Sequence, residues 1–104
     1  MKRFQDFFNI RIILSPEVEE HIKNTHPEMS GQDDKIRTTL LNPDIIMRSN
    51  SDPKSILYYC HFDTTPVTTK YLCVVVKILS NESFISTAYF RPTIKRGIIL
   101  WKKK

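Results

Sequence analysis

The sequence predicts an α+β domain in which two short N-terminal helices pack on a four- to five-stranded antiparallel β-sheet. Three observations support this fold class. Helix-start and helix-stop signals cluster between residues 15 and 43, the segments after residue 44 have the composition of strands, and the stretches between those strands are short and polar. Short connections favour antiparallel hairpins, because parallel strands need long crossovers. With 104 residues, 40% of them hydrophobic, we expect a single domain over residues 1–104 with one core.

Residues 7–14, FFNIRIIL, are predicted to form the first strand, since they are rich in β-branched residues and alternate around an arginine. A helix should follow at once. Ser15 is a favourable N-cap and Pro16 takes the favoured first helical position, while glutamates in the first turns complement the helix dipole. We expect this helix over residues 16–24, because Pro27 disfavours helical backbone angles in the residue before it.

The segment SGQDDKI signals a second helix, with Ser30 or Asp33 as its N-cap. Apolar residues at helical spacing give this helix one buried stripe, formed by Ile36, Leu40 and Leu41. The sequence Asn-Pro-Asp at 42–44 should end it. Four strands are predicted after it, or five with the last segment, over residues 45–48, 55–62, 70–79, 83–90 and 97–101.

Composition limits the classes of protein to which the chain can belong. It has 2 glycines, so Gly-rich phosphate loops and dinucleotide fingerprints are absent and we expect no cofactor. No run approaches the ~18 apolar residues that cross a bilayer, and polar residues interrupt the first ten, unlike a secretory signal. We therefore expect a soluble, cytoplasmic protein. Cys60 and Cys73 should be reduced strand residues, although a hairpin could set them face to face as an oxidised pair.

The formal net charge is +5, and cationic residues concentrate near the C-terminus. Lys95 and Arg96 precede the last predicted strand, and three lysines end a basic tail over residues 101–104. Positive charge favours polyanions such as RNA or DNA, because neutralising their phosphates releases condensed counterions. The same lysines could instead form a solvated tail that affects only solubility.

The stretch HIKNTHPE contains two of the three histidines, His21 and His26. It gives a metal site little support, because residues five positions apart on a helix point about 140° away from each other. Pro27 also moves His26 off the helix. Cys60, His61 and the acidic residues lack the spacing of a zinc or iron site, so we expect no metal.

Histidines also suit acid and base catalysis, since imidazole exchanges protons near neutral pH. RNA can be cleaved without metal when its 2′-hydroxyl attacks the neighbouring phosphate, which requires a base, an acid, and cations or donors for the charged transition state. The stretch SFISTAYFRPTIKRG supplies such donors and cations, namely Ser86, Thr87, Tyr89, Arg91 and Lys95. On a strand, Thr87 and Tyr89 point to one face and Ser86 and Ala88 to the other. If the Thr87 and Tyr89 face meets the end of the first helix, hydroxyls and histidines converge.

Each of these residues also has an ordinary structural explanation. Thr and Tyr favour strands, so Thr87 and Tyr89 could simply be sheet surface. His21 and His26 could stabilise the negative end of the helix dipole. His61 lies within the predicted strand ILYYCHF and has a weaker case for function than the other two histidines.

Several short segments, in this order, resemble a known family. LSPEVEEHIKNTHPE, TTLLNPDIIMRS, YYC, KYLCVVVKI, FISTAYF and IKRGIILW together resemble the phage-type members of the barnase, EndoU, colicin and RelE-like (BECR) nuclease superfamily, often called PBECR domains, over residues 12–101. The resemblance implies N-terminal helices followed by a four-stranded antiparallel sheet. It also implies a nuclease, and such domains commonly lie at the end of large phage or toxin proteins. Here we expect a small free-standing toxin with an antitoxin or immunity protein as partner.

Carried over residue by residue, the resemblance implies catalytic roles for His21, His26, Thr87, Tyr89 and Lys95. His26 would act as general base or acid, and His21 would share or orient that role. Thr87 and Tyr89 would contact the scissile phosphate, and Lys95 would neutralise its charge. Further contacts with RNA are expected from Arg91, Arg96, Lys102 and Lys103.

We therefore expect a metal-independent endoribonuclease that acts on tRNA or another structured RNA through histidine acid and base chemistry. The alternative is a non-catalytic module that binds RNA or a protein through the same basic surface, as a descendant that kept the fold and lost the chemistry would. A protein-interaction domain with no nucleic-acid role is a third interpretation.

Overall fold

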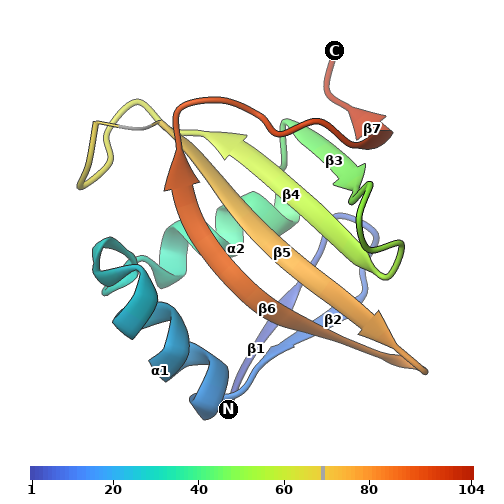
Figure 1. Ribbon diagram of the computed structural model, residues 1–104, viewed down its shortest axis with the longest axis horizontal. Coiled ribbons are helices and arrows are strands. Elements are labelled where there is room, and N and C mark those ends of the chain that lie inside the picture. Colours follow the sequence, from blue (N-terminus) through green and yellow to red (C-terminus); the bar gives the residue numbers. More distant parts are fainter. Residues whose placement is uncertain (69) are drawn as a thin grey trace.

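The computed structural model describes residues 1–68 and 70–104, which form one seven-stranded sheet with two α-helices and a short 3-10 helix (Figure 1). The elements are β1 (Lys2–Gln5), β2 (Arg11–Leu14), α1 (Pro16–Thr25), η1 (Pro27–Met29), α2 (Asp33–Leu41), β3 (Ile45–Arg48), β4 (Ser55–His61), β5 (Tyr71–Leu79), β6 (Glu82–Arg91) and β7 (Ile98–Lys102). The strands lie in the order β1-β2-β6-β5-β4-β3-β7. Neighbours are antiparallel except β2 and β6, which run parallel and pair at Ile13 and Phe84.

The chain has the two helices and the α+β composition that the sequence suggests, but the predicted sheet is wrong. It has seven strands rather than four or five, it is mixed rather than antiparallel, and two strands precede the helices. The predicted strand over residues 7–14 corresponds only in its second half to β2. Parallel pairing of β2 with β6 is feasible because a long stretch of chain, including both helices, connects them.

The hairpin of β1 and β2 accounts for the extra N-terminal strand. β1 has a weak sequence signal, because Phe4 is the one apolar side chain among its four residues. In the turn that follows, the Asp6 carboxylate accepts hydrogen bonds from the backbone N–H groups of Phe8 and Ile10 at 2.9 and 2.8 Å. Asn9 has a φ of 66°, a left-handed conformation that asparagine tolerates better than most residues. The first half of the predicted strand is therefore a turn.

Both predicted helices are present, and one predicted cap is wrong. The Ser15 Oγ accepts a hydrogen bond at 3.2 Å from the N–H group three residues further on, as expected of an N-cap. In α2, however, Gln32 occupies the N-cap position without a side-chain hydrogen bond, and Asp33 is the first helical residue. Ser30 lies before a turn at Gly31, whose φ is 76°, so neither Ser30 nor Asp33 caps the helix.

The strands predicted after residue 44 are confirmed to within one residue at each end, including the last one. Thr69, in the predicted loop before β5, lies outside the described residues. In β6 a register shift opposite Val75 and Val76 inserts Ser86 as an extra residue. Beyond this bulge Thr87, Ala88 and Tyr89 keep strict alternation.

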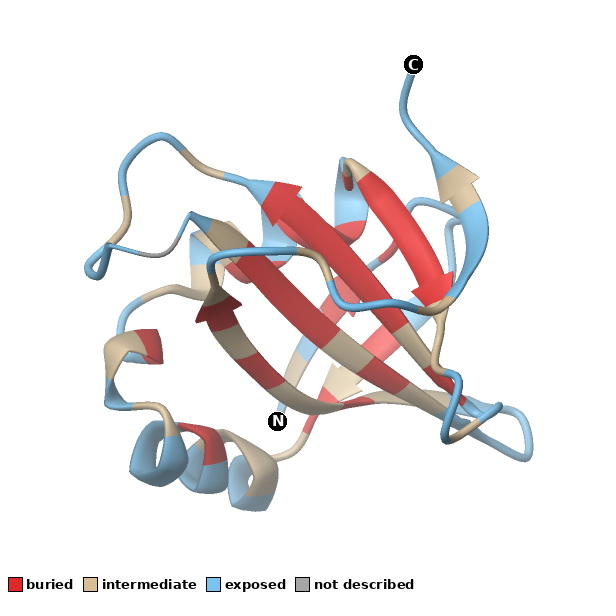
Figure 2. Ribbon diagram, turned by 45° about the horizontal axis from the view of Figure 1, so that its top comes forward, coloured by how far each residue is buried: buried red, intermediate tan, exposed pale blue. Residues whose placement is uncertain are grey.

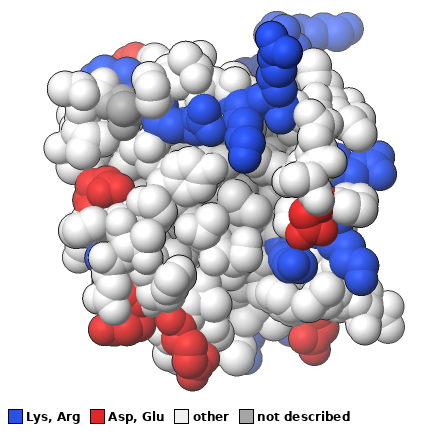
Figure 3. All heavy atoms as spheres, viewed as in Figure 1, with Lys and Arg blue, Asp and Glu red and all other residues white. Residues whose placement is uncertain are grey.

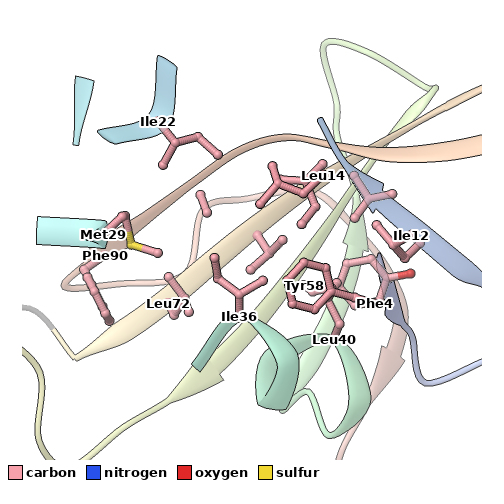
Figure 4. Close-up of a cluster of buried hydrophobic side chains, with 14 of the residues drawn as sticks. Phe4, Ile12, Leu14, Ile22, Met29, Ile36, Leu40, Tyr58, Leu72 and Phe90 are labelled. Carbon is pink, nitrogen blue, oxygen red and sulfur yellow. The ribbon is translucent and has the colours of Figure 1, made fainter. Parts of the chain in front are cut away.

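Both helices pack against one side of the sheet, and their contact forms the larger core (Figure 4). The core side chains are mostly aliphatic and include Ile22, Ile36, Leu40, Leu72, Val74, Ala88 and Phe90. Along β6, beyond the bulge at Ser86, buried residues alternate with partly exposed ones, which belong to the opposite face (Figure 2). The helices thus cover one face of the sheet and leave the opposite face without a helix over it.

Cys60 and Cys73 are free, buried thiols on opposite faces of the sheet. Cys60 pairs with Leu72 and Cys73 pairs with Tyr59, so the two sulfur atoms alternate and point apart. This geometry is incompatible with the oxidised pair that the sequence left open. Burial raises the pKa of each thiol to about 11.

We expect both thiols to resist alkylation by iodoacetamide at pH 8 and to react at once in denaturant, because only about 0.1% of each is thiolate in the folded chain. The unfolded thiols titrate near 9.0 and the folded ones near 11. Above pH 9 the unfolded state therefore loses protons first, and the free energy of unfolding should fall between about pH 9 and pH 11. Urea titrations at pH 7, 9 and 11 measure this fall; rapid labelling without denaturant would contradict the burial.

No helix in the described part of the chain combines the length and the apolar character that crossing a membrane demands.

Candidate functional site

The sheet face opposite the helices, which we call the open face, carries three rows of side chains set by strand pairing. The rows are His61, Tyr71 and Arg91; Tyr59, Cys73 and Tyr89; and Leu57, Val75 and Thr87. Ala88 and Phe90, which alternate with these residues on β6, point into the core beneath the helices. Thr87 and Tyr89 therefore share the open face, which Figure 1 shows with α2 behind the sheet.

His26 reaches the open face around the edge of β6. In the described part of the chain β2 pairs with β6 only near Phe84, so no strand flanks the Tyr89 end of β6 on that side. The end of α1 lies there instead, where the His26 N–H group donates a hydrogen bond to the Ile22 carbonyl at 2.6 Å. The His26 and Tyr89 rings are stacked, with centroids 5.3 Å apart and planes 27° apart. The helix end and the strand thus meet, as the convergence of hydroxyls and histidines requires.

Glu28 is close enough to orient the His26 ring. Its Oε1 atom lies 3.6 Å from His26 Nδ1, longer than a hydrogen bond but within ion-pair range. Both side chains are largely shielded from water, at 29% and 25% exposure. Glu28 therefore flanks the Nδ1 side of the His26 ring. The sequence-based candidates omit Glu28, although its place two residues after His26 could have suggested it.

The structure does not bring His21 into this group. Ile22 packs into the core, and His21 beside it lies on the exposed surface of α1. The His21 backbone carbonyl accepts a hydrogen bond from the Thr25 hydroxyl at 2.8 Å. Ser86 is also set apart, because its hydroxyl donates to the Val75 carbonyl at 3.3 Å. Of the predicted hydroxyl donors, Tyr89 contacts His26, and Thr87 lies two residues before Tyr89 on the same face of β6.

Burial keeps the middle row of the open face protonated. Tyr59 and Cys73 have no exposed surface. Burial raises the pKa of Tyr59 and of Tyr89, and the neighbouring Cys73 raises the pKa of both further. Tyr89 consequently remains a neutral phenol at physiological pH. It is a hydrogen-bond donor toward an anion, and it cannot serve as a base.

The connection between β6 and β7 carries Lys95 across the open face. Ile94 packs on the buried cluster of that face, and the Lys95 N–H group donates to the Tyr59 hydroxyl at 3.2 Å. Gly97 permits the close return to β3, since a Cβ there would lie 2.7 Å from the Arg48 carbonyl oxygen. The backbone at Lys95 is thereby anchored while its side chain stays exposed.

The other predicted RNA-binding residues lie at the same end of the open face. Arg91 ends β6, and Arg96 follows Lys95. A neighbouring cavity of about 310 Å³ is lined by Asp44, Ile45, Tyr71, Ile94, Lys102, Lys103 and Lys104. Figure 3 shows Lys and Arg spheres across the upper part of this face and Asp and Glu spheres at the lower left, where α1 lies.

The segment over residues 101–104, predicted as a basic tail, begins within β7, which includes Trp101 and Lys102. Lys102 belongs to β7 and pairs with Ile45. The Lys103 N–H group donates to the Asp44 carbonyl at 2.9 Å, so the backbone is held there as well. Strand pairing and this hydrogen bond therefore hold the backbone of Lys102 and Lys103 beside β3.

Two open-face residues escaped the sequence-based selection. Tyr71 pairs with Arg91 and lines the cavity of about 310 Å³ described above. The His61 ring meets the Tyr71 ring edge-on, with ring centroids 5.2 Å apart. His61 is an exposed residue whose Nδ1 lies 3.8 Å from Asp63. The signal that could have found them is alternation, because Tyr59 and His61 are two residues apart on one strand. The short stretch of sequence around β4 does not reveal that β5, which carries Tyr71, lies beside it.

Within residues 1–68 and 70–104, no three His, Cys, Asp or Glu side chains gather closely enough to hold a metal ion. No family model, curated protein or solved structure matches the chain. The resemblance to PBECR domains therefore rests on its motifs, and the chemistry of the site rests on the geometry given above.

Proposed function

We propose that this chain is a metal-independent endoribonuclease in which His26 accepts the proton of the attacking 2′-hydroxyl. The observation that carries the proposal is the stacking of His26 on Tyr89 at the edge of the basic open face. It brings a proton acceptor next to a neutral phenol donor, and Lys95 is anchored on the same face through Tyr59, so the groups that this reaction needs share one face. The PBECR-like motifs point to the same class of enzyme.

Each group has a distinct part in the proposed step. His26 Nε2 takes the proton as the 2′-oxygen bonds to phosphorus, and Glu28 favours the required ring orientation. Tyr89 and Thr87 donate hydrogen bonds to the phosphate oxygens, while Lys95 and Arg91 offset the charge that builds up on them. The bond from phosphorus to the 5′-oxygen breaks, and that oxygen takes a proton from water. The products are a 2′,3′-cyclic phosphate and a free 5′-hydroxyl.

Structured RNA such as tRNA is the substrate class we propose. The candidate site lies on an open sheet face with cations at one end, which suits the exposed backbone of a folded RNA. An antitoxin or immunity protein would inhibit the enzyme by covering the same face with acidic side chains.

The test is incubation of the purified chain with tRNA in EDTA, followed by analysis of the product ends. Cleavage that leaves 2′,3′-cyclic phosphates is expected. Salt-sensitive RNA binding without cleavage under any condition would instead favour the non-catalytic binding module. An absence of both binding and cleavage would favour the protein-interaction domain.

Replacing Lys95 with alanine is expected to lower kcat/KM for RNA by about 10- to 100-fold, the usual loss for one charge-assisted contact to a phosphate. Folding should be unaffected, since the backbone N–H group that bonds to Tyr59 remains. Lys54→Ala, in the turn before β4, is the control of equal charge and should act like the wild type. Equal losses in both variants would show that only net charge matters.

A further inference from the structure

A second group of cations lies at the β1 edge of the sheet. It borders an open cavity of about 480 Å³ that is lined by Arg3, Phe4, Gln5, Arg11, Arg37 and Leu41. These residues come from β1, β2 and α2, and none of them belongs to the proposed catalytic group. The volume falls within the range of roughly 300–1,000 Å³ that is usual for small-molecule sites.

The fold assembles this cavity at the outer edge of the sheet. In the described chain β1 pairs only with β2, with Gln5 opposite Arg11, so the other edge of β1 has no strand partner. α2 packs along β1 and supplies Arg37, whose guanidinium carbon lies 5.1 Å from the centre of the Phe4 ring. This cation–π contact orients the Arg37 guanidinium group beside the unpaired edge of β1.

Positive charge in the cavity is largely uncompensated. Its lining contains three arginines and no carboxylate. The one described acidic partner is Asp34, 3.7 Å from Arg37, and its side chain is fully exposed, where an ion pair contributes little. Lys2 shows the contrast, since it forms ion pairs with both Glu19 and Asp33. An anionic ligand would therefore offset positive charge that the described carboxylates leave largely unpaired.

We propose that this cavity binds a nucleoside polyphosphate. Guanidinium groups form paired hydrogen bonds with phosphate oxygens, and three of them match a chain of two or three phosphates better than a single one. The exposed Leu41 supplies an apolar wall for the base and sugar, and the nearly buried Phe4 adds only the rim of its ring. Binding here is independent of the proposed ribonuclease activity.

Calorimetric titration with ATP, GTP, pyrophosphate and a single-stranded RNA octamer tests the proposal. We expect a nucleoside triphosphate to bind most tightly, and Arg11→Gln and Arg37→Gln each to weaken it by about tenfold or more. Arg48→Gln on β3 removes an equal charge outside the cavity and should leave the affinity unchanged. His26→Ala should also leave it unchanged, which separates this result from that of RNA cleavage.

Three results would overturn the proposal. Equal affinity of Arg11→Gln, Arg37→Gln and Arg48→Gln would show attraction to net charge alone. Pyrophosphate binding as tightly as ATP and GTP would remove the role of the nucleoside. Tighter binding of the RNA octamer through the same arginines would assign the cavity to a nucleic-acid backbone instead.

Discussion

Replacing His26 with alanine is expected to lower the rate of RNA cleavage by about 10²- to 10⁴-fold, the usual contribution of a positioned acid or base. The loss should fall on kcat, because the cations that bind RNA remain in place. Stability should change little, since the side chain is partly exposed and its ring meets Tyr89 at the sheet edge. Single-turnover cleavage of tRNA in EDTA measures the effect.

Two further variants isolate the chemistry of His26 from its packing. His26→Phe keeps an aromatic ring over Tyr89 but has no nitrogen, so it should be as inactive as His26→Ala. His21→Ala removes the other histidine of HIKNTHPE, which the structure leaves on the outer surface of α1, and should keep nearly full activity. Activity retained by His26→Phe, or lost in His21→Ala, would contradict the assigned role.

Replacing Asp6 with alanine is expected to lower the free energy of unfolding by about 3–5 kcal/mol, since it breaks a buried polar network. The Asp6 side chain accepts hydrogen bonds from Tyr58 Oη at 2.6 Å and from the Phe8 and Ile10 N–H groups at 2.9 and 2.8 Å. Asp6 and Tyr58 are each 3% exposed. Burial and the Asp6 carboxylate raise the pKa of Tyr58, so the phenol stays protonated and donates.

Urea denaturation followed by circular dichroism measures this loss. Tyr58→Phe removes one bond of the network and should cost about 1–2 kcal/mol. Asp63→Ala, which alters a fully exposed carboxylate, should stay within about 0.5 kcal/mol of the wild type. A cost below about 1 kcal/mol for Asp6→Ala would mean that water satisfies the groups left behind.

The sequence predicted helices and strands well where the signal lay within a few adjacent residues. The Ser15 cap and the strands after residue 44 depend on a few adjacent residues, and they appear where expected. The extra strand β1 has only Phe4 to reveal it, and its pairing with β2 depends on a turn that the FFNIRIIL pattern conceals. The parallel pairing of β2 with β6 joins residues far apart in sequence, which no local pattern encodes.

The residues of the candidate site also differ in whether a local signal identified them. Alternation on one strand was enough to group Thr87 with Tyr89, and Pro27 was enough to separate His26 from the helix. The partners Glu28, Tyr71 and His61 depend on which strands become neighbours and on how a helix end meets a sheet edge. Long-range register decides both, so these residues had only weak signals.

The central claim is that RNA lies on the open face against His26 and Tyr89, and NMR titration with a 2′-O-methyl RNA tests it most directly. The methyl group blocks the attacking oxygen, so binding can be observed without cleavage. We predict that the side-chain signals of His26 and Tyr89 shift on binding, while that of His21 does not. Shifts confined to His21 and the outer surface of α1, with His26 and Tyr89 unmoved, would contradict the claim.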